Sequence, residues 1–340
     1  MTLPATDGGT GLTARPAVAS RTRLTAIGRT VLRKLVDIVV VLFVAATFVF
    51  LVLQLMPGDP VDVLLKGIFE ITPAVRQEVI ADYGLDRPVL EQYWRFISGI
   101  VQGDLGHSYQ MRQPVTEIIA GSIGPTAVLA AAALGLAIVF AVIGATASAG
   151  RGPIASLVTQ TLELLAISVP SFWIGLLLLT AFSFNLPIFP SSGARGIESL
   201  VLPAITLAIP VTGILAQILR ERMDETLEQP FVITARTRGA GDARVRIVHV
   251  LRHAVLPALN FSGAVLGSLL IGTAVIETLF ARPGLGRVLL QAVIANDMPL
   301  IMGIIVFGAL VFVVVNSLVD IIAAAIDPRL RIEAGVRSAW

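Results

Sequence analysis

Long runs of apolar residues, separated by shorter polar segments, dominate the pattern of this chain. Crossing about 30 Å of hydrocarbon takes about 20 apolar residues in a helix. Six stretches meet this requirement: 35–56, 126–148, 164–184, 200–219, 255–280 and 300–326. Lipid offers no partner to a free peptide group, so such runs cross as helices. The pattern predicts an all-α, polytopic membrane protein with six transmembrane helices.

These stretches divide the chain into five predicted parts. They are a disordered tail (1–28), a first transmembrane helix (29–56), an extramembrane segment (57–123), a core of five transmembrane helices (124–326) and a second tail (327–340). The core contains a long polar loop at 220–256. In the extramembrane segment, prolines suited to the first helical turn predict helices near 73–83 and 88–101.

Three prolines, Pro170, Pro203 and Pro210, lie inside the predicted spans. Proline removes a backbone donor, so we expect each of them to bend or break its helix. Such breaks are tolerated in a bilayer where neighbouring helices or a water-filled path satisfy the freed carbonyl groups. The prolines are therefore either common features of membrane helices or elements that shape a translocation path.

Most of the 25 basic residues fall on the side of the membrane that would hold both termini. They are Arg15, Arg21, Arg23, Arg29, Arg33, Lys34, Arg151, Arg220, Arg222, Arg236, Arg238, Arg244, Arg246, Arg252, Arg329, Arg331 and Arg337. Basic residues near the ends of spans mark the cytoplasmic side. The sequence therefore predicts cytoplasmic N- and C-termini and a cytoplasmic loop at 220–256. It places residues 57–123 on the extracytoplasmic side of the membrane.

Composition excludes several classes of function. Charged residues make up 14% and hydrophobic residues 55% of the chain, and the net charge of +2 follows from the membrane topology rather than from a nucleic-acid partner. The chain has no cysteine, which excludes disulfides, thiolate metal sites and thiol nucleophiles. It also has no Gly-x4-Gly-Lys-Ser/Thr run, so we do not expect it to hydrolyse ATP itself.

Several short strings occur in an order and spacing that resemble one protein family. They are Pro-Gly-Asp-Pro at 57–60, Tyr-Gly-Leu-Asp-Arg-Pro at 83–88, Val-Pro-Ser-Phe-Trp at 169–173, Leu-Pro-Ala-Ile-Thr-Leu at 202–207, Glu-Thr-Leu-Phe-Ala-Arg-Pro-Gly-Leu-Gly at 277–286 and Asp-Pro-Arg at 327–329. Together with the loop at 231–257, these strings resemble the permease subunits of dipeptide, oligopeptide and nickel ABC importers. The resemblance covers about residues 30–331 and leaves the N-terminal tail unmatched.

This resemblance implies a type I ABC importer permease fold in a bacterial cytoplasmic membrane. It further implies a heterodimeric permease, in which a second, homologous permease subunit forms the other half of the pathway. Two ATP-binding subunits that use ATP and Mg would supply energy, and an extracytoplasmic solute-binding protein would deliver cargo. The chain itself would contact membrane lipid, bind no cofactor, metal or nucleic acid, and perform no catalysis.

The loop at 231–257 resembles the EAA loop of this family, whose short coupling helix docks on an ATP-binding subunit. Pro230 suits a helix start, Gly239 would end that helix, and Asp242 could cap the next one. By resemblance, the docking positions are Thr234, Ala235, Arg236, Gly239, Gly241, Asp242, Arg244 and Arg246. Small residues allow close approach, and Arg244 and Arg246 could pair with an acidic rim. The alternative is an amphipathic helix that lies on anionic lipid.

Ionisable residues within predicted spans are functional candidates because they are expensive to bury in lipid. Glu277 closes the fifth predicted span and is followed by Arg282. Two interpretations of these residues stay open: a structural ion pair that holds the outer loop, or a contribution to an outer gate or substrate path. Glu163 precedes the core of the third predicted span, where we expect an interfacial location.

The sequence leaves three alternatives to a peptide importer. The cargo could be nickel or another small solute instead of a peptide. An ion-coupled secondary transporter would place carboxylates or broken helices at the middle of the membrane, and the chain offers only marginal candidates for this. An intramembrane enzyme would need a paired catalytic set, whereas His107, His249 and His253 all fall outside the predicted spans.

Overall fold

The computed structural model describes residues 18–55, 61, 64–65 and 72–326. Within these residues the regular secondary structure is helical, apart from one isolated bridge between His107 and Pro114. The elements are α1 (Val18–Gln54), α3 (Pro73–Tyr83), α4 (Val89–Gln102), α5 (Val115–Ser148), α6 (Pro153–Ser168), α7 (Ser171–Leu179), the π-helical turn η1 (Thr180–Asn185), α8 (Glu198–Leu227), α9 (Pro230–Thr237), α10 (Asp242–Arg244), the π-helical turn η2 (Val245–Val250), α11 (Leu251–Leu279), α12 (Leu285–Ala295) and α13 (Met298–Ile326). The predicted all-α class is confirmed.

Several of these helices are long and apolar enough to cross a membrane. Among the described residues there are four: Lys34–Gln54 within α1, all of α5, all of α8, and Met298–Val319 within α13. The bent pair α6–α7 with η1 would make a fifth. The remaining predicted span, 255–280, falls on α11 and its C-cap residue. The exact number of six spans therefore stays a prediction.

The third predicted span, 164–184, is not one straight helix. α6 ends at Ser168, α7 begins at Ser171, and their axes differ by 95°. Pro170 lies at this break because it has no N–H to continue the helix and keeps the residue before it, Val169, in an extended conformation. α8, by contrast, continues as one helix through Pro203 and Pro210.

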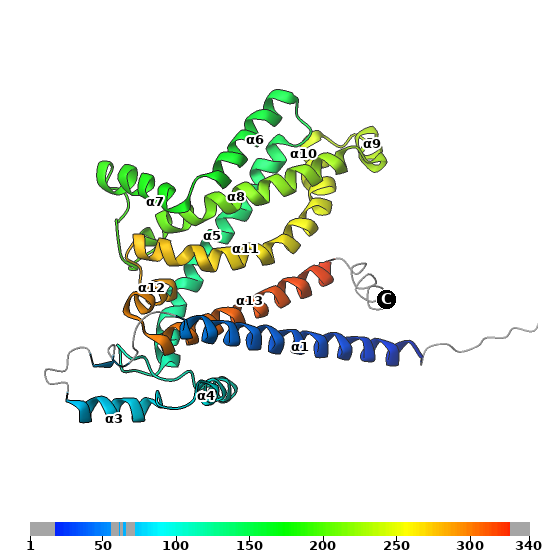
Figure 1. The fold of residues 1–340 in the computed structure, drawn as a ribbon. Helices are drawn as coiled ribbons and strands as arrows, with labels where there is room; N and C mark the ends of the chain where they lie inside the picture. Colours follow the sequence, from blue (N-terminus) through cyan, green and yellow to red (C-terminus); the bar gives the residue numbers. More distant parts are fainter. Residues whose placement is uncertain (1–17, 56–60, 62–63, 66–71, 327–340) are drawn as a thin grey trace, which may run out of the picture.

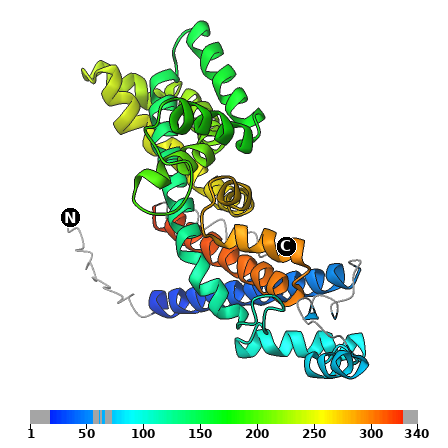
Figure 2. The same ribbon diagram turned by 90° about the vertical axis from the view of Figure 1, so that its left-hand side faces the viewer.

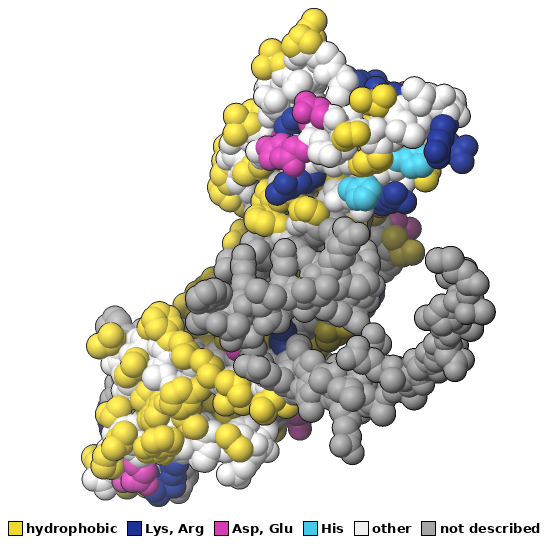
Figure 3. All heavy atoms as spheres, turned by 90° about the vertical axis from the view of Figure 1, so that its right-hand side faces the viewer, with side chains coloured by type: hydrophobic (Ala, Val, Ile, Leu, Met, Phe, Trp, Pro, Cys, Tyr) yellow, Lys and Arg dark blue, Asp and Glu magenta, His cyan; other side chains and the backbone are white. Residues whose placement is uncertain are grey.

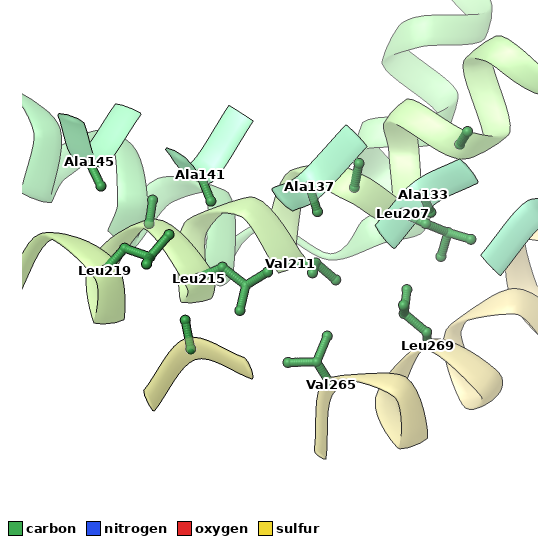
Figure 4. Packing of buried hydrophobic residues seen from close by; sticks show 14 of the residues in the cluster. Ala133, Ala137, Ala141, Ala145, Leu207, Val211, Leu215, Leu219, Val265 and Leu269 are labelled. Atoms are coloured by element: carbon green, nitrogen blue, oxygen red, sulfur yellow. The ribbon is translucent and has the colours of Figure 1, made fainter. Parts of the chain in front are cut away.

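A stripe of alanine residues on α5 forms the core of the helix bundle. Alanine recurs every fourth residue, at Ala133, Ala137, Ala141 and Ala145, and all four side chains are fully buried. Figure 4 shows this stripe facing Leu207, Val211, Leu215 and Leu219 of α8, next to Val265 and Leu269 of α11. Small residues let two helix backbones approach closely, which is a main source of helix association in lipid. α5 and α8 accordingly form the most extensive helix contact in the described part of the chain.

A second hydrophobic cluster forms around α1 and α13, which lie side by side in Figures 1 and 2. The first turns of α5 also belong to it, through Val115 and Ile118, which join Ile301 and Ile304 of α13. α5 therefore connects both clusters: its beginning packs with α13, and its alanine stripe packs with α8.

The two ends of the bundle carry different elements. In Figure 1 the start of α1, the end of α13, α9 and α10 lie toward one end, whereas α3, α7 and α12 lie toward the opposite end. α3 and α4 agree with the helices predicted near 73–83 and 88–101. Pro73 occupies the first turn of α3, and the Thr72 hydroxyl accepts a hydrogen bond from the Val75 N–H at 3.3 Å.

Some predicted boundaries differ from the structure. α1 begins at Val18, so residues 18–28 of the predicted tail are helical, because no proline follows Pro16 before the first span. Residues 1–17 and the predicted tail 327–340 lie outside the described residues. α5 begins at Val115, within the predicted segment 57–123, because the helix continues through Pro125.

Candidate functional site

Residues 228–250, called here the α8–α11 loop, fold into α9, α10 and η2. α9 starts with Pro230, whose missing N–H is harmless in the first turn. It ends at Thr237, and Gly239, where φ is +85°, turns the chain out of the helix; the N–H groups of Gly239 and Ala240 donate to the carbonyls of Arg236 (2.9 Å) and Ala235 (3.1 Å). This pair of bonds is a Schellman motif, which satisfies the last carbonyls of a helix. The predicted helix end at Gly239 is thus observed.

The underside of the loop is fastened to the end of α5. Arg246 is buried, its Nε donates to Asp242 at 2.6 Å, and its Nη1 donates to the carbonyl of Ala149. A cation at this position also meets the negative end of the α5 dipole. Val232 and Val245 are buried beneath the loop. The loop is therefore held against the bundle by both a charged anchor and apolar contacts.

Most of the predicted docking residues face outward. Six side chains or glycines are exposed: Thr234, Arg236, Gly239, Gly241, Asp242 and Arg244. Ala235 is half-buried and Arg246 is buried. The structure therefore leaves these six residues exposed along the loop and turns Arg246 inward, so that within this chain its guanidinium is already bonded.

The sequence predicted that Asp242 caps a helix, but in the structure its side chain does not do so. The capping position is Gly241, and Asp242 is the first residue of α10. Its carboxylate instead accepts hydrogen bonds from Arg246 at 2.6 Å and from Arg236 at 3.4 Å. The two arginines compete successfully for the carboxylate because charge-assisted bonds are stronger than bonds to a neutral amide.

Apolar side chains accompany the basic ones on this surface. Ile233, Ile247 and Val248 are exposed, and the ring of Phe231 contacts that of His253 with centroids 5.3 Å apart. Figure 3 looks onto this end of the molecule and shows arginine and histidine side chains gathered in its upper part. An apolar surface edged by cations can bind either an acidic-rimmed protein or anionic lipid, so both sequence-based interpretations stay open.

Behind the loop, a run of polar contacts joins α5, α8 and α6. The Gly150 N–H, next to the anchored Ala149, donates to the Asp224 carboxylate at 2.6 Å. Asp224 lies 3.8 Å from Arg220, whose Nη2 donates to Glu163 at 2.8 Å. Both Glu163 and Arg220 are buried. Glu163 thus forms a buried ion pair between α6 and α8, and its interfacial depth in the membrane stays a prediction.

At the opposite end, Glu277 binds the first turn of α12. Its carboxylate accepts hydrogen bonds from the Thr126 hydroxyl (2.6 Å) and from the N–H groups of Gly286 (2.9 Å) and Arg287 (3.1 Å). Gly284 leaves room for this carboxylate, because a Cβ there would overlap it. Glu277 therefore caps α12 from a different helix and ties it to α5 and α11.

Arg282 has other partners than the one expected. Its Nη1 donates to the carbonyl of Ser199 at 3.0 Å, and this is the carbonyl that Pro203 leaves without a helical donor. No side-chain N···O distance of 4.0 Å or less joins Arg282 to Glu277, both of which are described. Burial lowers the pKa of Arg282 below its usual value, and the charge of Glu277 opposes this. The Arg282 N–H donates to the Glu277 carbonyl at 2.8 Å, but the two side chains form no ion pair, and a role in an outer gate stays a prediction.

One buried carboxylate, Asp297, was not among the residues predicted from the sequence. It accepts hydrogen bonds from the Ser108 hydroxyl (2.5 Å) and from the N–H groups of Tyr109 and Gln110 (both 3.1 Å). It thereby joins the α1–α5 connection (residues 55–114) to the start of α13. An aspartate directly before Met-Pro at a helix start is a capping signal that could have identified it. Among the described residues, no group of three His, Cys, Asp or Glu side chains could hold a metal ion.

Comparison with known proteins agrees with this architecture. Residues 137–332, more than half of the chain, match the family model described as binding-protein-dependent transport system inner membrane component, and residues 27–130 match the model for its N-terminal part. A protein of Brucella abortus (strain 2308), named as a peptide transport system permease protein, is 35% identical over 310 residues. A glutathione transport system permease protein of Salmonella paratyphi A is 34% identical over 304 residues.

The aligned regions cover 88% of this chain and 98% of each of these relatives. The same coverage holds for a glutathione transport system permease protein of Escherichia coli O6:H1, which is 34% identical. Together with the apolar helices, these matches describe a multi-pass membrane protein. The chain belongs to the family of inner membrane components of binding-protein-dependent transport systems.

Proposed function

We propose that this chain is a membrane-spanning permease subunit of an ATP-driven, binding-protein-dependent importer of di- or oligopeptides. It forms one half of the translocation pathway, and a second, homologous permease subunit forms the other half. Relatives named for peptide and for glutathione, itself a tripeptide, support this cargo class. A solute-binding protein delivers the cargo on the outer side.

We infer that the end with α9 and α10 faces the cytoplasm. The arginines of this end support the assignment, since basic residues gather at cytoplasmic span ends. The start of α1 and the end of α13 lie toward the same end, which agrees with cytoplasmic N- and C-termini. The α1–α5 connection then lies on the outer side, where it can meet the solute-binding protein.

The observation that carries the proposal is the form of the α8–α11 loop. Its outer surface exposes Arg236, Arg244 and Ile233, whereas its underside is fastened to α5 by Arg246. A surface that is exposed but rigidly held can transmit force between a soluble partner and the bundle. We infer that two ATP-binding subunits dock here and use ATP and Mg, while this chain remains a non-catalytic subunit without a cofactor of its own.

The docking surface can be tested with the tagged chain, purified together with its partner subunits. Arg244→Gln removes an exposed cation, and Gly239→Val strains the left-handed turn that ends α9. Both changes are expected to reduce the amount of ATP-binding subunit that co-purifies, while membrane insertion stays normal. Arg222→Gln is the matched control, because Arg222 is exposed on α8 and, among the described residues, forms an ion pair only with Glu225 one turn away.

Deletion of residues 230–244 gives the decisive outcome. If uptake of labelled dipeptides continues at the normal rate without this segment, the loop does not couple transport to ATP. Uptake that continues without any ATP-binding subunit would indicate an ion-coupled transporter. Comparing labelled peptides with radioactive nickel in a deletion strain separates the peptide cargo from the alternative of nickel or another small solute.

A further inference from the structure

Helix α4 packs against the apolar part of α1, near the C-terminal end of that helix. The hydroxyls of Tyr93 and Thr47 are 2.8 Å apart. The ring of Phe50 meets those of Tyr93 edge-on (centroids 5.4 Å apart) and Phe96 in a stack (6.2 Å). The apolar part of α1 runs from Lys34 to Gln54. At 1.5 Å per residue, these contacts lie roughly 6–10 Å inside the end of the span.

One flank of α4 is covered by its own connection to the neighbouring elements. Gln92 donates to the carbonyls of Arg87 at 2.9 Å and Leu85 at 3.4 Å. A Cβ on Gly99 would lie 2.7 Å from the carbonyl oxygen of Asp104. This flank therefore faces the rest of the α1–α5 connection, on the side away from the membrane core.

The opposite flank of α4 carries an exposed apolar row. Leu90, Trp94 and Val101 are exposed by 67%, 55% and 84%, and half-buried Ile97 lies between them. Spacings of four, three and four residues put all four side chains on one side of a helix. The flank with Gln92 faces the α1–α5 connection. The apolar row lies on the opposite side of the helix, so it faces away from that connection.

The orientation of α4 agrees with this assignment. Figure 1 looks along the α4 axis while α1 runs across the view, so α4 is inclined to the span and does not run parallel to it. Close to the contact, α1 exposes Phe48 and Leu51. Hydrophobic side chains also cover the lower part of Figure 3, at the height of α1 and α4. The apolar row thus adds to the exposed apolar side chains of α1 at this height.

The exposed polar residues of α4 complete the pattern of a helix at an interface. Glu91, Arg95, Ser98 and Gln102 are exposed on the arc beside the apolar row and away from α1. A helix with one apolar and one polar side lies in the plane of the bilayer surface, and tryptophan favours that depth. A helix fully surrounded by water would leave the apolar row without any partner.

We propose that α4 lies in the membrane–water interface, with Leu90, Trp94 and Val101 inserted among the lipids of the leaflet on the α3–α4 side. The helix then fixes the height of the α1–α5 connection above the bilayer. This assignment concerns a lipid surface and does not depend on the proposed cargo or on ATP. If a second permease subunit or the solute-binding protein covered the same row, the row would contact protein instead of lipid.

The depth of Trp94 can be measured because the chain has only three tryptophans. Trp173→Phe and Trp340→Phe leave Trp94 as the only tryptophan of this chain. Any tryptophan of the partner subunits is replaced by phenylalanine, and the complex is reconstituted in phosphatidylcholine/phosphatidylglycerol vesicles. Brominated acyl chains are expected to quench its emission, whereas aqueous acrylamide is expected to have little effect.

Two neighbouring positions give a matched comparison. In a background without tryptophan, Val101→Trp is expected to respond like Trp94, whereas Gln102→Trp, on the polar arc, should be quenched by acrylamide instead. If acrylamide quenches positions 94 and 101, the row faces water and the proposal fails. If neither quencher reaches them, a protein partner covers the row and the lipid assignment is equally wrong.

A second label keeps the test independent of the tryptophan replacements. The chain has no cysteine, so Leu90→Cys gives a single site for a nitroxide spin label. Collision with oxygen, which concentrates in lipid, should exceed collision with a water-soluble nickel chelate. The reverse ratio would overturn the insertion of α4 even if the tryptophan variants failed to fold.

Discussion

The buried ion pair between Glu163 of α6 and Arg220 of α8 allows a quantitative prediction. Arg220 donates from Nη2 to one carboxylate oxygen at 2.8 Å and from Nε to the other at 3.1 Å, and the two side chains are only 6% and 7% exposed. Gly213 lies so close to α6 that a Cβ would be 2.9 Å from the Glu163 carbonyl oxygen. The low exposure of both side chains shows that the pair is largely shielded from bulk water.

Removing one partner leaves the other charge buried and uncompensated, which costs about 3–5 kcal/mol. Replacing both with apolar residues of similar volume is near neutral or even stabilising by about 1–4 kcal/mol. We expect Arg220→Met to cost more than Glu163→Leu. After loss of Glu163, Arg220 can still approach Asp224, now 3.8 Å away, whereas Glu163 has no second cation among its described contacts.

The assay is a double-mutant cycle on the free energy of unfolding, obtained by titrating mixed micelles with SDS and following circular dichroism. The cycle consists of Glu163→Leu, Arg220→Met and the double variant. The exposed pair Arg222–Glu225, 2.8 Å apart on α8, is the control and should contribute about 0–1 kcal/mol. Single variants with a near-native free energy of unfolding would refute a buried, mutually compensating pair. A double variant whose loss of stability equals the sum of the two single losses would refute it as well.

Three further changes probe other contacts. Gly284→Ala places a Cβ onto the Glu277 carboxylate, and loss of its bonds to α12 should cost about 1–3 kcal/mol, seen as a lower melting temperature. Asp297→Asn removes the charge that binds residues 108–110 and should cost about 1.5–3 kcal/mol; faster amide exchange in that segment is the readout. Gly239→Ala forces a side chain into φ +85°, which should cost about 1–2 kcal/mol and speed exchange of the α9 C-terminal amides. Unchanged exchange or melting in any variant would contradict the corresponding contact.

Local sequence signals predicted the helices well where a single segment determines its own structure. Pro73 and Pro88 marked the starts of α3 and α4, and Pro230 and Gly239 marked both ends of α9. The early start of α5 was not predicted, because an apolar window detects the lipid-facing length of a helix and not its extension beyond the membrane. The bend near Pro170 was expected, but its angle depends on packing against other helices.

Contacts between distant segments could not be read from the sequence. Pairing of Glu163 with Arg220 requires the relative register of α6 and α8, which no local pattern contains. Arg246 and Arg244 looked equivalent, yet Arg246 turns inward because the end of α5 offers a carbonyl there. Glu277 was matched to Arg282, its neighbour in sequence, whereas its actual donors come from α5 and α12.

The contact between Arg282 and the Ser199 carbonyl has a consequence for sequence variation among relatives. The guanidinium stands in for the amide hydrogen that Pro203 lacks, so the two positions form one unit although they lie far apart in the chain. In a homologue with alanine at the position of Pro203, the helix would supply its own donor. Arginine at the position of Arg282 would then no longer be needed to donate to this carbonyl. Substitutions at the two positions should therefore occur together among homologues.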